Sequence, residues 1–496
     1  MIDPVSAYKA MRSRDPRFDG IFFVGVTSTG IYCRPICPVK PPLRKNCKFF
    51  ASAEAAEKAA FRPCLRCRPE LAPGNAPVDR AQRIAYLLVQ RMEEGQLDDG
   101  VRLEELAAQF ELSSRQLRRI VQTELGVSPV ELLQTRRLLL AKQLLTETAL
   151  PVTAVAFASG FSSLRRFNDA FSLHYRMPPS RLRKQVIGQT AELGDAGTSV
   201  LQLSYRPPYA WDAMLEFLRA RAMTAVECVN ADSYARTVRL GRRTGWVRVT
   251  HAPEKRALRV QFTHSLTPVL PALLGRLRSL FDLSARPDLI AAHLKQDPRL
   301  KTSVRQCPGL RVPGAFDGFE MALRAIVGQQ ITVKAATTIA GRIATAFGRK
   351  FVTPFPELTR LSPLAEQLAG ASVADIARLG IVSARAASIL ALARAYATGA
   401  LKLEAGSNWD RSIQQLVALP GIGDWTAHYI AMRALRWPDA FPSGDIAVRK
   451  NLGGVSAKEA EALSVKWRPW RSYAVVHLWR GIAPASLRTC PSALTL

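Results

Sequence analysis

The sequence lacks the features that mark membrane and secreted proteins. It has no run of about 18 apolar residues, as a membrane-spanning helix needs, and its start, MIDPVSAYKAMRSRD, has no apolar core of the kind found in secretory signals. Its 8 cysteines among 496 residues are too few for a disulfide scaffold. No low-complexity tract is present. We therefore expect a cytoplasmic protein without a membrane partner.

Acidic residues are also scarce relative to basic ones. Asp and Glu number 40 against 69 Lys and Arg, which gives a formal net charge of +29 and a pI near 10.4. Such an excess usually serves a polyanion, so nucleic acid is the expected partner. Hydrophobic residues make up 48% of the chain, so most of it can fold. At this length we expect roughly three or four domains of about 150 residues each.

Turn-forming residues and hydrophobic periodicity divide the chain into regions. Residues 1–78 hold the cysteine-rich part and end in the turn-rich segment PELAPGNAPVD. Residues 79–185 have apolar positions at helical spacing, and residues 186–200 are small and polar, which is typical of a linker. Residues 201–285 combine alternating runs such as WVRVTH and ALRVQFTH with a helix at WDAMLEFLRARA. Residues 286–496 are predicted to be helical.

Five cysteines lie within residues 33–67, and four of them form two close pairs. The pattern Cys33-x3-Cys37 followed by Cys64-x2-Cys67 supplies the four soft ligands of a tetrahedral Zn²⁺ site. One zinc ion is therefore expected. The simplest alternative is a purely structural zinc, which replaces the core that so short a module can hardly build. Cys47 stands outside the pattern and is predicted to be packed.

The residues that flank the cysteines indicate a particular family, which the cysteine spacing alone does not. The stretches FFVGVTSTGIYCRPICP and FRPCLRCRPE resemble the N-terminal domain of the Ada regulatory family. The resemblance implies that Cys33 accepts a methyl group from a methylphosphotriester in DNA, and zinc would hold its sulfur as a thiolate. The basic residues of the loop suit a DNA backbone, Arg34 among them, although a basic loop can also be merely solvated. Family positions that contact the backbone fall on Thr29, Lys40 and Arg62.

The second region contains two copies of a helix-turn-helix pattern. LEELAAQFELSSRQLRRIVQTELG places a cap at Ser113 or Ser114, and the copy beginning VTAVAFASGFSSLRRFNDAF places a turn at Gly160 and a cap at Ser162. With a long helix at 129–146 between them, the copies resemble the AraC-type regulator domain rather than a plain helical bundle. The resemblance implies a transcriptional activator that works with RNA polymerase. The residues expected to face the major groove are Arg115, Gln116, Arg118, Arg119, Ser163, Arg165, Arg166 and Asn168.

The stretch LPGIGDWTAHYIAMRAL carries a hairpin with glycines at Gly421 and Gly423. These glycines allow a tight turn, after which the first amides of the next helix can approach a DNA phosphate. The stretch resembles the helix-hairpin-helix of base-excision DNA glycosylases. DAFPSGDIAVRKNLG follows, and the resemblance implies that Asp445 is the catalytic aspartate. Asp439 is the competing acid.

The resemblance extends from Leu203 to Gly481. YRPPYAWDAMLEFLRARA, FDGFEMALRAIVGQQITV and WRPWRSYAVVHLW resemble the 3-methyladenine DNA glycosylase II family, whose α+β domain precedes a helical body. Trp467 and Trp470 are predicted to be core residues. Gln330 stands where a known relative has an apolar wedge. The substrate-pocket positions implied are Trp425, Tyr429, Trp479, Gln329 and Gln330.

The implied chemistry is the excision of alkylated purines such as 3-methyladenine. Electron-rich rings attract cationic bases, and the Asp445 carboxylate would stabilise positive charge on the sugar. Trp425 occupies the place of the lysine that strand-cleaving glycosylases use, so a monofunctional enzyme is expected. The alternative is a regulator whose glycosylase half only binds damaged DNA. No PCHR-type motif is present, so O6-alkylguanine transfer is not expected.

The predicted architecture is multidomain and mainly α. It comprises a small zinc-bound α+β module, an all-α double helix-turn-helix domain, an α+β domain and an all-α helix-hairpin-helix body. Double-stranded DNA, alkylated or carrying an operator, is the expected partner of a nucleoid-associated protein.

Overall fold

The structure is a computed structural model that describes residues 3–72, 112–186, 197–404 and 407–481, with isolated positions between 84 and 108. It consists of two compact units. The first comprises residues 1–207, 252–275 and 283–286, and the second comprises residues 208–251, 276–282 and 287–496. Within the described ranges, no helix has the length and apolarity needed to cross a bilayer. The first helix of the first helix-turn-helix copy falls largely outside these ranges.

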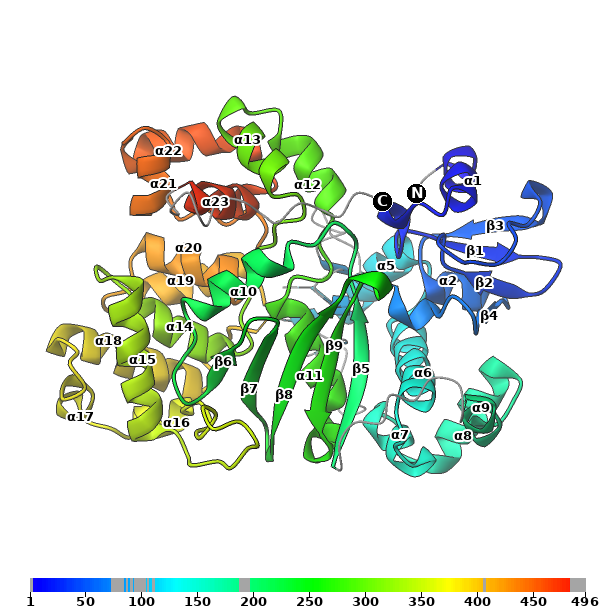
Figure 1. The fold of residues 1–496 in the computed structure, drawn as a ribbon, viewed down its shortest axis with the longest axis horizontal. Helices are drawn as coiled ribbons and strands as arrows, with labels where there is room; N and C mark the ends of the chain where they lie inside the picture. Colours follow the sequence, from blue (N-terminus) through cyan, green and yellow to red (C-terminus); the bar gives the residue numbers. More distant parts are fainter. Residues whose placement is uncertain are drawn as a thin grey trace. The chain divides into compact units, whose positions relative to one another are not determined.

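The N-terminal module is a small sheet flanked by short helices (Figure 1). The strand order is β3-β1-β2-β4, with β1 antiparallel to both neighbours and β2 parallel to β4. Phe23, Tyr32 and Phe61 form its core together with alanines of α2. The elements are α1 (Pro4–Arg12), β1 (Phe23–Val26), β2 (Ile31–Cys33), β3 (Cys47–Phe50), α2 (Ala53–Lys58) and β4 (Arg62–Pro63). The predicted α+β module is confirmed.

The helix-turn-helix region follows in the same unit. Its described helices are α5 (Ser114–Leu125), α6 (Pro129–Glu147), α7 (Val152–Ala158), α8 (Leu164–Tyr175) and α9 (Pro179–Val186). Ser113 caps α5 as predicted, and Gly160 turns the chain with φ of +90°. The cap predicted at Ser162 is wrong. Ser163 caps α8 instead, because its hydroxyl accepts the Arg166 N–H at 3.1 Å.

Five strands follow in the sheet order β5-β9-β8-β7-β6. In the first unit β5 is antiparallel to β9, and in the second β7 is antiparallel to both β6 and β8. Buried and part-exposed residues alternate along β5 and β9, so one face is buried. The strands are β5 (Thr198–Ser204), β6 (Glu227–Val229), β7 (Ser233–Leu240), β8 (Arg243–Ala252) and β9 (Ala257–Thr263), with helix α10 (Trp211–Arg219) between β5 and β6. The predicted strands and helix are confirmed, and β5 begins inside the segment predicted as linker.

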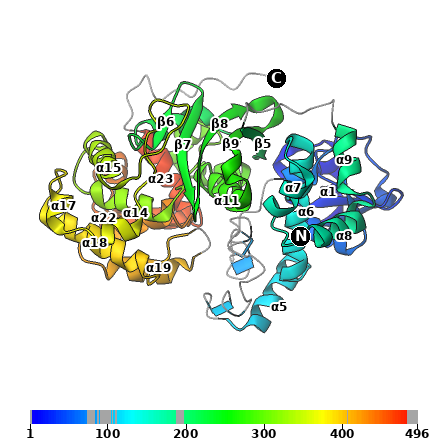
Figure 2. The same cartoon turned by 90° about the horizontal axis from the view of Figure 1, so that it is seen from below.

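The described residues from 270 to 481 are mainly helical, in agreement with the helical region predicted from residue 286 onward. Helices α15, α18 and α20 pack around the buried helix α14. Figure 2 shows α14 together with α15 and α18. The helices are α11 (Leu270–Leu280), α12 (Pro287–Leu294), α13 (Pro298–Gln306), α14 (Gly318–Val327), α15 (Val333–Phe347), α16 (Ala365–Ala369), α17 (Val373–Ala377), α18 (Ser383–Ala397), α19 (Trp409–Val417), α20 (Asp424–Arg433), α21 (Ile446–Asn451), α22 (Ala457–Ser464) and α23 (Arg471–Arg480).

A buried ion pair joins α6 to the cysteine module. Lys142 donates to the Glu70 carboxylate at 2.7 Å and to the Cys64 carbonyl at 3.0 Å, and both charged side chains are 1% exposed. Arg68 contacts the same carboxylate at 3.1 Å. Burial alone would raise the pKa of Glu70, but Lys142 and Arg68 outweigh it and lower that pKa. The pair therefore stabilises the fold at neutral pH, and this contribution is lost as the pH falls through the lowered pKa.

Replacing Lys142 by Met should destabilise this unit by about 3 to 5 kcal/mol, since the buried Glu70 charge loses its closest partner. Lys184→Met on the exposed face of α9 is the matched control and should change stability by less than about 0.5 kcal/mol. Urea unfolding of the full chain measures both. Equal stability of the two variants would show that the ion pair contributes nothing.

Candidate metal centre and candidate active site

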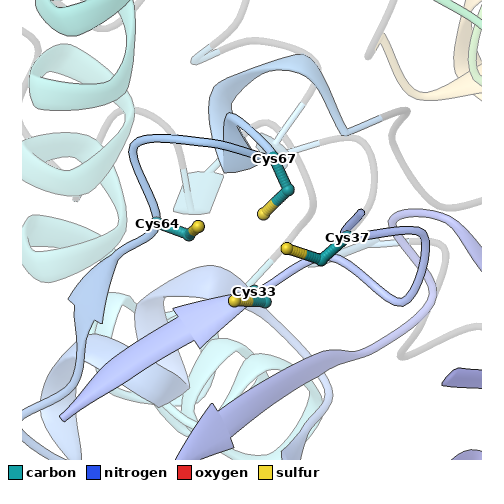
Figure 3. Close-up of side chains that lie close together, drawn as sticks. All are labelled: Cys33, Cys37, Cys64 and Cys67. Carbon is teal, nitrogen blue, oxygen red and sulfur yellow. The ribbon is translucent and has the colours of Figure 1, made fainter. Parts of the chain in front are cut away.

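The four predicted ligand cysteines converge at one point. Cys33 ends β2, Cys37 lies in the loop after it, and Cys64 and Cys67 follow β4 (Figure 3). All four sulfur atoms lie within 4.8 Å of one another. Tetrahedral Zn²⁺ with Zn–S bonds of about 2.3 Å needs sulfurs about 3.8 Å apart, so the cluster fits one such ion. The predicted four-cysteine zinc site is confirmed.

The cluster is supported by backbone donors. The N–H of Arg34 points at Cys67 Sγ at 3.3 Å, and the N–H of Arg66 at Cys64 Sγ at 3.4 Å. Such donors orient metal ligands and moderate their charge.

Arg34 itself is a structural residue. Its side chain is buried, pairs with the Asp19 carboxylate and donates to the Cys67 carbonyl at 3.1 Å. The prediction that it faces DNA is therefore wrong, because the fold turns this side chain inward. Cys47 packs against the cluster formed by α1 and Phe22, as predicted.

The other predicted DNA contacts of the first unit lie at its surface. Thr29 and Lys40 are exposed and Arg62 is half-buried. In α5 and α8 the exposed side chains are Arg115, Gln116, Arg118, Arg119, Arg165, Arg166 and Asn168. Two of the predicted readers also have local roles, because Ser163 caps α8 and the Gln116 oxygen accepts the Ser113 N–H at 2.9 Å.

In the second unit, Asp445 is the N-cap of α21 and is 9% exposed. Its Oδ1 accepts the Val448 N–H at 2.9 Å and the Trp479 indole N–H at 3.2 Å. Its Oδ2 accepts the Trp425 indole N–H at 3.2 Å. Three donors therefore fix one carboxylate, and two of them belong to predicted pocket residues. The sequence predicted these residues separately, and the structure brings them together.

Aromatic rings continue from the carboxylate. Trp425 stacks on Tyr429 with ring centroids 5.6 Å apart, and Tyr429 lies 6.1 Å from Trp479. Trp479 stacks in turn on Phe217 of α10, at 6.0 Å. Sequence reasoning missed Phe217. The only available signal was its place in WDAMLEFLRARA, where an aromatic residue normally indicates core.

Two arginines missed by the sequence analysis border the same rings. Arg221 lies over the Phe217 ring at 3.9 Å, and Arg433 lies at 4.7 Å from the same ring and donates to the Tyr429 hydroxyl at 2.8 Å. Burial alone would raise the pKa of Tyr429, but Arg433 and Arg221 outweigh it and lower that pKa. Arg324 holds the Arg221 carbonyl. No local sequence pattern marks these contacts.

Several other predictions can be compared with the structure. Asp439 accepts two bonds from the buried Arg471, at 2.9 and 3.1 Å, and so belongs to an ion pair. Trp467 and Trp470 are buried, which confirms them as core residues.

The hairpin glycines and the two glutamines lie in turns beside helices. Gly421 and Gly423 form the turn before α20 and are exposed. Gln329 and Gln330 follow α14.

Comparison with known proteins agrees with this layout. Family models match the metal binding domain of Ada at residues 6–70, a helix-turn-helix domain at 106–185, the AlkA N-terminal domain at 200–317 and the HhH-GPD superfamily of base excision DNA repair proteins at 323–466. The fold and the two sites thus define a metal module and a DNA-binding helix-turn-helix domain fused to a glycosylase-type body.

Relatives match almost the whole chain or parts of it. A probable bifunctional transcriptional activator/DNA repair enzyme AlkA of Mycobacterium tuberculosis is 41% identical over 481 residues, which is 95% of each chain. DNA-3-methyladenine glycosylase 2 of Escherichia coli is 33% identical over 56% of this chain and 95% of its own length. Ada of Escherichia coli is 39% identical over 25% of this chain and 33% of its own. The chain belongs to the family of bifunctional transcriptional activator/DNA repair enzymes of the AlkA type.

Proposed function

We propose that the protein excises alkylated purines such as 3-methyladenine from DNA and also captures methyl groups at Cys33 to regulate transcription. The single observation that supports excision best is the Asp445 carboxylate, which two pocket tryptophans hold by their indole N–H groups. A carboxylate so oriented beside an aromatic pocket can stabilise the positive charge that develops on the sugar and orient the attacking water. The base itself would be flipped into the pocket.

The arginines limit which rings can receive a cationic base. Guanidinium groups already lie against Phe217 and Tyr429. The faces of Trp425 and Trp479 are then the ones that a cationic purine would meet, close to the carboxylate. Because Trp425 takes the lysine position of strand-cleaving relatives, we propose simple hydrolysis that leaves an abasic site.

The hairpin is the proposed phosphate grip. A Cβ on Gly423 would meet no protein atom within 4 Å, so its side faces open space before the first amides of α20. A phosphate can approach such amides closely. Backbone contacts of this kind position the duplex without reading its sequence.

Among the four ligands, Cys33 is the best candidate for the nucleophile. Cys64 and Cys67 are buried, whereas Cys33 and Cys37 are half-buried. Exposure therefore leaves Cys33 and Cys37 as candidates, and the resemblance to the Ada family, in which the first of the four cysteines accepts the methyl group, favours Cys33. Its thiolate would attack the methyl group of the phosphotriester, and the leaving group is a phosphodiester.

Methyl capture would also change the charge of the centre. Four thiolates on Zn²⁺ carry a net charge of about −2, and methylation of one halves it. DNA binding by the module should tighten, which would let the exposed residues of α5 and α8 engage an operator. Activation through RNA polymerase is the regulatory output we propose for this state.

Purified protein incubated with methylated duplex DNA tests the proposal. Free 3-methyladenine should appear, the DNA should gain abasic sites without strand breaks, and a methyl group should appear on the protein. A protein that binds the DNA but releases no base would instead be a regulator with a damage-binding half.

A further inference from the structure

The turn between α14 and α15 carries an exposed side chain on an unusual backbone. Gln330 is exposed at this turn and has φ of +57°. Residues other than glycine rarely adopt this left-handed region, and the conformation costs roughly 1 kcal/mol or more. It persists only where the surrounding structure holds the turn in place.

Two anchors hold the residue before it. The Gln329 side-chain amide donates to the Gly421 carbonyl and to the Thr426 hydroxyl, each at 2.9 Å. From the other side, Arg385 of α18 donates to the Gln329 carbonyl at 2.7 Å. An amide has two N–H donors, and both are used here. Gln329 is therefore engaged by the hairpin, although the sequence analysis placed it in the substrate pocket.

The three elements meet closely. Gly421 has φ of +75°, and a Cβ there would lie 2.2 Å from Ser388 Oγ of α18. Thr426 is 2% exposed and directly follows Trp425, whose indole N–H donates to Asp445. The turn, the proposed phosphate grip and the carboxylate are thus connected through short hydrogen bonds and the buried Thr426.

We propose that Gln329 and Arg385 are positioning residues that fix the Gln330 turn to the hairpin. When the hairpin grips the backbone, Gln330 is then carried into the duplex at a fixed distance and fills the space left by the flipped nucleotide. This inference rests on the proposed function. It assigns the two residues to nucleotide flipping rather than to cleavage of the glycosidic bond, since neither touches the carboxylate.

Two DNA duplexes distinguish nucleotide flipping from cleavage of the glycosidic bond. Both carry the same alkylated purine, one opposite its normal partner and the other opposite an abasic-site analogue, where little pairing has to be broken. Excision is measured at single turnover with saturating protein. In Gln329→Ala and in Arg385→Ala, excision should fall about tenfold or more opposite the normal partner and less than about threefold opposite the analogue.

Matched controls lie on exposed surfaces of the same body. Gln306→Ala on α13 and Arg394→Ala on α18 remove the same side-chain types away from the turn and should leave both rates unchanged. Arg385→Lys keeps one donor and should recover part of the loss. Because Gln329 and Arg385 anchor the turn independently, one variant remains informative if the other does not fold.

Equal losses on the two duplexes, or no loss on either, would overturn the inference. If the unmodified protein excises no base from either duplex, the proposed function fails. The inference is then decided by the fluorescence of 2-aminopurine placed beside the lesion. If the unmodified protein raises the 2-aminopurine fluorescence and both Gln329→Ala and Arg385→Ala raise it less, the inference is supported. Equal increases in fluorescence with all three proteins would refute it.

Discussion

Asp445→Asn should abolish the release of 3-methyladenine, with a fall in the single-turnover rate of about three orders of magnitude or more. The substitution removes the negative charge that would stabilise the developing sugar cation. It keeps an oxygen that can accept the Val448 N–H, so the cap of α21 survives. Its new NH2 group also faces an indole donor, which disturbs the site further. Affinity for undamaged DNA should not fall, because a negative charge is lost.

Asp439→Asn is the matched control, since it makes the same chemical change in the other acid of this stretch. Its partner Arg471 is 3% exposed, so losing the ion pair should lower stability by a few kcal/mol. The folded fraction should still excise bases at close to the normal rate. High-performance chromatography of released bases and a thermal unfolding curve decide the matter. Undiminished excision by Asp445→Asn would remove this residue from the mechanism.

Cys33→Ser should eliminate methyl transfer from methylphosphotriester DNA to the protein. The hydroxyl is a far weaker nucleophile, and zinc affinity should fall because one of four thiolates is lost. Mass spectrometry of the unmodified protein should show one added methyl, and fragment ions should place it on Cys33. Chelation of the zinc should also prevent the reaction, since the thiolate then loses its metal.

Cys47→Ser is the control for the methyl transfer, because this thiol lies outside the metal cluster. It should bind zinc and accept the methyl group normally. Cys37→Ser should weaken zinc binding as Cys33→Ser does, but it keeps the proposed acceptor Cys33. Comparison of the two variants therefore separates the effect of losing zinc from the effect of losing the acceptor. A methyl group found on Cys37 in the unmodified protein would contradict the assignment.

Local patterns in the sequence were sufficient for much of the site. The two cysteine pairs fix a ligand set by spacing alone, and the glycines of PGIG fix a turn before a helix. The helix α6 and the strands β8 and β9 could be predicted because their hydrophobic periods are local. The resemblance of quoted motifs to known families supplied the candidate roles, Asp445 and Cys33 among them.

The direction in which individual side chains point could not be predicted from the sequence. Arg34 sits in a basic loop, yet it turns inward to Asp19, while its neighbour Lys40 is exposed. Likewise Ser163, rather than Ser162, caps α8. A shift of one residue in the start of a helix changes which side chain caps it. Hydrophobic periodicity does not fix a helix boundary to within one residue.

The order of the domains, the four zinc ligands, the hairpin and the acid after it could all be predicted from the sequence alone, because each rests on a short pattern with its own chemistry. The contacts of Trp479 with Phe217, of Phe217 with Arg221 and Arg433, and of Gln329 with the hairpin became visible only in the folded chain. These contacts join residues that are far apart in the chain. Their distances depend on how helices pack around α14, and no local spacing encodes that packing.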